Sequence, residues 1–229
     1  MILSILLFYN PLLIALSVIG ANLPDFDHKF KKDNVYKMII FGLLIFIILY
    51  ILDLPYFIGI VITVLGGIFY FSNHRGFTHS IFGLIILTVL SAVLIVSSYE
   101  FILNNQFIYI SNDLFIMVIL IALFGVLTLN KKLYLLFLPI FLISLFFINN
   151  LTVNYITITL SIFLGLLSHL ILDSFTPSGI KLFSPLSSKK VHKKFGISLT
   201  ILLFFVITLN FYFNFDYITI FFNTFLGFY

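Results

Sequence analysis

Long apolar stretches follow one another along almost the whole chain, with only short polar segments between them. Of the 229 residues, 62% are hydrophobic and only 9% are charged. A soluble domain carries about 25% charged residues, and a fold of this size has too little interior to bury so much apolar surface. The sequence therefore predicts a single integral membrane domain over residues 1–229.

Several of these stretches approach the length of about 20 residues that a membrane-crossing helix needs. We expect an all-α fold, a polytopic transmembrane helix bundle with about eight spanning helices. The expected spans are 2–22, 37–52, 54–71, 80–98, 112–129, 132–149, 154–173 and 196–215. Pro139 predicts a kink in the sixth span.

The basic residues predict an orientation for this bundle. With eight spans, all 12 Lys and Arg residues fall in or beside loops on one side of the membrane. By the positive-inside rule, that side faces the cytoplasm. The expected location is therefore the cytoplasmic (inner) membrane. Both termini are then expected outside, with loops 23–36, 72–79, 130–133 and 174–195 in the cytoplasm.

The chain contains no cysteine. Disulfides and thiolate metal sites are thereby excluded, so any metal must be bound through histidine nitrogens or oxygen atoms. Histidines and acids from three separate segments gather on the predicted cytoplasmic side. The candidate metal ligands are Asp25, Asp27, His74, His79, His169 and Asp173.

The first segment carries Asp25 and Asp27 directly after Pro24. Because a proline disfavours helix at the residue before it, the first span should end here. We expect the two acids in extended chain, where side chains two positions apart need not point the same way. The alternative is a solvated loop whose acids balance the lysines that follow.

The second segment places His74 and His79 on either side of Arg75. Imidazoles are common ligands of divalent metals, and an arginine beside them suits an anionic oxygen. Thr78 or Ser80 is a suitable N-cap for the next helix. The alternative is a polar turn in which Arg75 serves only as a topology charge.

The third segment has a polar or small residue at every fourth position: Thr157, Ser161, Gly165, His169 and Asp173. This spacing puts all five on one helical face. Small residues allow close helix packing in a membrane, and ionisable ones face the bundle interior. The last two could chelate an ion, or could form a hydrogen bond that only holds helices together.

The turn after that helix contains Pro177 and Gly179, which should end the helix. The hydroxyls of Thr176 and Ser178 could bind substrate, although capping the turn is the more ordinary role. The basic run 189–194 that follows suits attraction to anionic headgroups.

Together, the three segments resemble the YdjM-type family of inner-membrane proteins, described as metal-dependent hydrolases and also as LexA-binding. The matching motifs are Leu23-Pro24-Asp25-x-Asp27, His74-Arg75-Gly76-x-Thr78-His79-Ser80 and Ser168-His169-x-x-x-Asp173-x-x-Thr176-Pro177-x-Gly179. The last two motifs are also similar to those of zinc-dependent phospholipase C and P1-type nucleases. That similarity implies metal-assisted phosphoester hydrolysis. We expect substrate contacts from Thr78, Ser80, Thr176 and Gly179.

The candidate ligands themselves suggest the same chemistry. Their number fits one or two divalent ions, with Zn²⁺ as the leading candidate and Mn²⁺ or Fe²⁺ as alternatives. We expect metal-activated water to attack a phosphorus or carbonyl centre, with Arg75 stabilising the developing charge. Asp25 or Asp27, if not coordinated, could act as general base. The expected substrate is a phospholipid or another membrane-borne phosphoester, and no nucleic-acid partner is expected.

Two other classes of protein share some of these features. A metal or proton transporter also carries intramembrane histidines and acids, but usually near the midplane. A non-enzymatic membrane scaffold could use the same cluster to hold helices together. It would bind metal without turnover.

Overall fold

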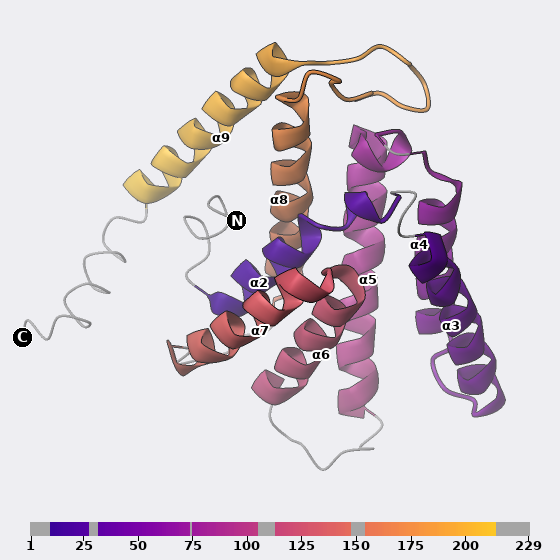
Figure 1. Cartoon of the computed structure of the whole chain (residues 1–229). Coiled ribbons are helices and arrows are strands. Elements are labelled where there is room, and N and C mark those ends of the chain that lie inside the picture. Colours follow the sequence, from indigo (N-terminus) through magenta and orange to yellow (C-terminus); the bar gives the residue numbers. More distant parts are fainter. Residues whose placement is uncertain (1–9, 28–31, 74, 105–112, 148–153, 214–229) are drawn as a thin grey trace, which may run out of the picture.

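The computed structural model describes residues 10–27, 32–73, 75–104, 113–147 and 154–213. The fold is all-α, as predicted, and no strand occurs within these ranges. Figure 1 shows how the helices are arranged. The α-helices are α2 (Pro11–Gly20), α3 (Lys32–Ile51), α4 (Phe57–Phe71), α5 (Ile81–Asn104), α6 (Asp113–Thr128), α7 (Lys131–Ser144), α8 (Tyr155–Ser174) and α9 (Lys193–Phe213). The 3₁₀ helices are η1 (Pro24–Asp27), η3 (Phe77–His79) and η4 (Leu145–Phe147).

Within the part of the chain that the structure describes, three helices are long and apolar enough to cross a membrane: Asp33–Ile51, Ile81–Asn104 and Tyr155–Ser174. α4 and α6 are apolar but shorter. α7 has 14 residues, with Pro139 inside it. At 1.5 Å per residue, a helix of that length falls short of a hydrocarbon core about 30 Å thick. Membrane character is therefore supported, and the count of eight spans stays a prediction.

α3 and α4 form a helical hairpin. The chain reverses at Asp53, whose φ of 53° lies in the left-handed region that tight turns use. Large apolar side chains on this hairpin are exposed, among them Ile51 at 72% and Phe71 at 84%. An apolar outer surface of this kind is expected where helices face lipid.

α2 packs closely across α8 (Figure 1). A Cβ on Gly165 would lie only 2.1 Å from the carbonyl oxygen of Ser17, so a glycine is needed at this crossing. The hydroxyl of Ser161 is fully buried and donates to the carbonyl of Leu13. The predicted polar stripe on this helix is thus an interior face from Ser161 onward. Thr157, at its start, is partly buried, and its hydroxyl donates to the carbonyl of Asn154.

The polar turns meet at one end of the bundle. η1 contacts both η3 and α4, and η3 contacts α5, which begins directly after it. α8 packs against α5 and ends near the same place (Figure 1). The fold therefore brings together the three segments that the sequence singled out.

Candidate metal centre

Asp25 and Asp27 lie in η1, not in extended chain as predicted. A proline pre-sets φ for the first position of a helical turn, so Pro24 starts this turn as well as ending the preceding helix. The amide of Phe26 donates to the carbonyl of Leu23 at 3.1 Å. With about three residues per 3₁₀ turn, side chains two positions apart point in different directions. The two acids consequently reach different partners.

His79 is the last residue of η3 and is fully buried. The next residue, Ser80, caps α5 as predicted, since its hydroxyl accepts from the amide of Gly83 at 3.1 Å. The same hydroxyl donates to the carbonyl of Phe77 at 2.6 Å. This cap fixes the direction in which α5 starts and thereby the position of the histidine before it.

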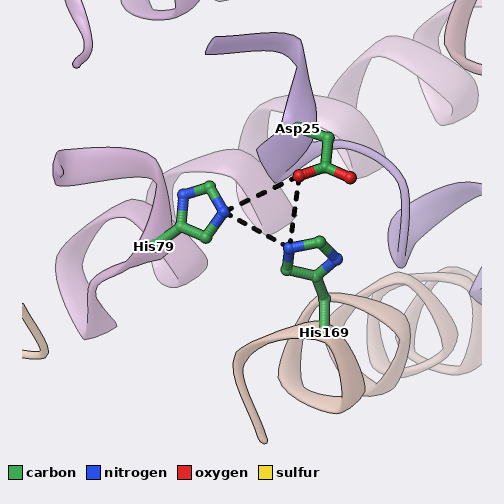
Figure 2. Close-up of side chains that lie close together, drawn as sticks. All are labelled: Asp25, His79 and His169. Atoms are coloured by element: carbon green, nitrogen blue, oxygen red, sulfur yellow. Dashed lines mark hydrogen bonds and ion pairs between the residues drawn. The ribbon is translucent and has the colours of Figure 1, made fainter. Parts of the chain in front are cut away.

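The ring nitrogens of two histidines face each other at the centre of the cluster. Nε2 of His79 lies 3.3 Å from Nε2 of His169 on α8. Oδ1 of Asp25 lies 3.9 Å from the first nitrogen and 3.6 Å from the second. Figure 2 shows the three side chains converging from three elements. They form a group of potential ligands whose atoms lie within 4.8 Å of one another.

Asp173 borders the same pair of nitrogens. Its Oδ2 lies 3.2 Å from Nε2 of His79 and 3.6 Å from Nε2 of His169. Two atoms bound at 2.0–2.1 Å to a tetrahedral zinc lie about 3.3 Å apart. The separations of 3.3–3.9 Å among Asp25, His79 and His169 therefore fit a single divalent ion, and Asp173 lies beside this group. Nitrogen and carboxylate oxygen without thiolate suit Zn²⁺, Mn²⁺ or Fe²⁺.

Asp27 supports His79 from the other side of the ring. Its Oδ2 lies 3.4 Å from Nδ1 of His79 and accepts a short hydrogen bond from the Thr78 hydroxyl. That hydroxyl lies 3.1 Å from the same Nδ1. A carboxylate behind a ligating histidine fixes the tautomer and orientation of the ring. In this position Asp27 could orient His79, and its expected role as a ligand or a base stays a prediction.

His169 also has a second partner. Its ring forms a hydrogen bond with the backbone of Ala21, at the end of α2. Helix ends leave carbonyls without an intrahelical partner, so a carbonyl there is available to a side chain. Sequence reasoning missed this contact and that of Asp27. The predicted end of the first helix could have indicated a carbonyl available to a side chain. The spacing of Asp27 did not indicate its contact with His79.

The cluster is buried on one side and open on the other. The His79 and Asp27 side chains are inaccessible, whereas the Asp25 side chain is 44% exposed. Structural zinc sites are closed by four protein ligands, whereas catalytic sites keep one position for water or substrate. The partly exposed Asp25 at the rim resembles the arrangement of catalytic sites.

Arg75 lies beside the cluster with φ of 58°, an unusual backbone conformation for a residue other than glycine. Its charge interacts electrostatically with Asp173. Its Nε is buried, and no hydrogen-bond partner for that atom is found among the described residues. An observed backbone outlier of this kind costs about 1–3 kcal/mol and is common at functional sites. The neighbouring candidate ligand, His74, lies outside the described residues.

The structure gives local roles to the four residues that were expected to contact substrate. The hydroxyls of Thr78 and Ser80 are buried and hydrogen-bonded inside the protein. Thr176 donates to the carbonyl of Asp173 at 2.7 Å, which caps the end of α8. Gly179 has φ of +62° and turns the chain. A substrate role for these four residues stays a prediction.

The chain was compared with known proteins and protein families. A family model, described as YdjM inner membrane protein, matches residues 2–228 and so covers all three motifs. The chain belongs to the YdjM inner membrane protein family. No curated protein and no solved structure matches this YdjM-family chain. The comparisons therefore support membrane location, and the chemistry of the site has to be argued from its geometry.

Proposed function

We propose that this YdjM-family protein is a membrane-embedded, metal-dependent hydrolase. The observation that carries the proposal is the convergence of Asp25, His79 and His169, whose potential ligand atoms lie 3.3–3.9 Å apart at a partly open site. Two imidazoles and a carboxylate with an open position are a frequent ligand set of hydrolytic metal centres. Asp173 adds a second carboxylate beside the same nitrogens.

Each residue then has a distinct task. His79 and His169 would hold the ion from the buried side and Asp25 from the exposed rim, while Asp173 lies beside both histidine nitrogens. A bound divalent ion lowers the pKa of a water molecule and polarises the bond under attack. Arg75, whose charge already acts on Asp173, stabilises negative charge that develops on the substrate.

The proposed substrate is a phosphoester that resides in or at the membrane, such as a phospholipid headgroup. Arginine prefers the planar arrangement of anionic oxygens that phosphate offers. The site lies at the end of apolar helices, where a headgroup would be found, rather than in the middle of the bundle. The distribution of basic residues supports a position of this end at the cytoplasmic face, under the positive-inside rule.

A structural role is the second candidate. The cluster joins η1, η3 and α8, which are distant in sequence, so an ion bound there would also hold the bundle together. This scaffold would bind the same metal but catalyse nothing.

Metal analysis combined with a substrate screen separates the two candidates. The purified full-length protein should contain about one Zn²⁺, Mn²⁺ or Fe²⁺ per chain, and anomalous scattering should place it about 2.0–2.2 Å from the ligand atoms if it is zinc. The screen should use bis(p-nitrophenyl) phosphate and vesicles of defined phospholipids. Turnover that is lost on chelation and restored by metal supports the hydrolase. Stoichiometric metal with no turnover of any phosphoester supports the scaffold.

A further inference from the structure

A separate cavity lies between the α3–α4 hairpin and the junction of α6 and α7. Its volume is about 670 Å³, within the range of small-ligand sites, about 300–1,000 Å³. The lining residues that matter here are Lys37, Phe41, Ile62, Val126, Asn130 and Lys131. No aspartate or glutamate is among the residues that line it.

The rim of this cavity is cationic. Lys37 enters from α3 and Lys131 from the first turn of α7, and both side chains are exposed. Neither ammonium forms an ion pair within the part of the chain that the structure describes. Asn34 and Asn130 add amide groups beside them. Two unpaired cations and two amides favour an anion with several oxygens.

The walls of the cavity are apolar. They include Phe41 of α3, which belongs to a candidate membrane span, together with Ile62 of α4 and Val126 of α6. An aqueous phosphate would gain nothing from such walls. A molecule with an anionic head and apolar chains would satisfy both the rim and the walls.

We propose that this cavity binds an anionic phospholipid of the surrounding bilayer. The phosphate lies between Lys37 and Lys131, and the acyl chains lie along Phe41 and Val126. The site uses none of the residues of the metal centre and does not rest on the hydrolase proposal. It holds a lipid whether or not that lipid is ever hydrolysed.

The test counts lipids retained by the full-length protein. The protein is reconstituted into nanodiscs of phosphatidylcholine mixed with phosphatidylglycerol and then released from them. The lipid that stays bound is measured by native mass spectrometry. Lys37→Gln or Lys131→Gln should each weaken phosphatidylglycerol retention about fivefold, and the double variant about 30-fold, since each lysine near an anionic headgroup contributes about that factor. The matched control is the double variant Lys189→Gln/Lys190→Gln, which removes the same charge from the exposed basic loop.

A further variant tests the walls. Val126 is 54% exposed, so Val126→Trp can narrow the cavity without crowding the core. It should lower phosphatidylglycerol retention while leaving the melting temperature and metal content unchanged. All measurements are repeated in His169→Ala, where retention should be unaffected, so failure of the metal centre and failure of the lipid site are distinguishable.

Three results would overturn the proposal. One is equal retention of phosphatidylglycerol and phosphatidylcholine by the wild-type chain. Another is equal loss of lipid in the cavity and control double variants, which would mean general attraction to a basic surface. The third is recovery of the protein as a dimer that Val126→Trp disrupts, with no lipid bound, which would make the cavity a contact between two copies.

Discussion

Nε2 of His79 and Nε2 of His169 lie 3.3 Å apart, although the two histidines are 90 positions apart in the sequence. His79 is inaccessible to solvent, and His169 is largely buried. Two protonated imidazoles could not face each other at this distance without strong repulsion. A cation between the nitrogens, shared with the carboxylate of Asp25, would instead accept a lone pair from each ring.

His169→Ala should remove most of the bound metal and abolish any phosphoesterase activity. The histidine supplies one of the few ligands, so the remaining groups cannot hold the ion tightly. Metal content per chain is measured by mass spectrometry, with His192→Ala in the exposed basic loop as the matched control. After chelation, wild type and His169→Ala should melt within about 2–4 °C of each other. Unchanged metal content with a much lower melting temperature would instead make this histidine a structural residue.

Asp27→Asn should weaken metal binding without removing a ligand. The carboxylate orients His79 through Nδ1, and loss of such a partner typically costs about 10–100-fold in metal affinity or activity. Competition with a chelator of known affinity measures the change. Asp25→Asn is the comparison, since it replaces a ligand at the rim. An affinity identical to wild type in Asp27→Asn would show that the buried carboxylate does not tune the site.

Arg75→Ala should keep the metal and lose about 10²–10³ in rate, the cost of one charge-stabilising donor. Arg75→Gly removes the same charge but tolerates the φ of 58° without the strain of about 1–2 kcal/mol that a side chain suffers there. The two variants should therefore be equally slow, and the glycine variant should melt at the higher temperature. If both variants kept full activity, the only role left for the charge of Arg75 would be to help set the orientation of the chain in the membrane.

Gly165→Ala should destabilise the bundle, because its Cβ would lie 2.1 Å from the carbonyl oxygen of Ser17. Overpacking of this kind typically costs about 1–3 kcal/mol. Gly67→Ala on α4 is the control, since a Cβ there meets nothing within 4 Å. Thermal unfolding in one detergent compares the two variants. Equal melting temperatures would argue against the close crossing of α2 and α8.

The orientation can be tested by labelling single cysteines, because the chain has none of its own. Lys190→Cys should react only with reagents that reach the cytoplasm, whereas Asp53→Cys should react from outside. The positive-inside rule gives this assignment. Labelling of Lys190→Cys in intact cells by an impermeant reagent would reverse it.

The sequence determined the helical membrane character of this protein and the chemistry available to it. Apolar stretches of this length leave the backbone no alternative to helix in a bilayer. The absence of cysteine restricts any metal to nitrogen and oxygen ligands. The spacing of His169 and Asp173, one helical turn apart, already placed both on one face, and the family resemblance from the three motifs is confirmed by the family match.

Only the tertiary structure decided which candidates meet and in what roles. Asp25 and Asp27 are two positions apart, and local pattern could not show that one reaches the shared nitrogens while the other supports His79 from behind. That difference follows from a 3₁₀ turn docked against η3, a contact between segments about 50 residues apart. Helical and strand periodicity report the faces of single elements, whereas ligand geometry depends on how several elements pack, which no local spacing encodes.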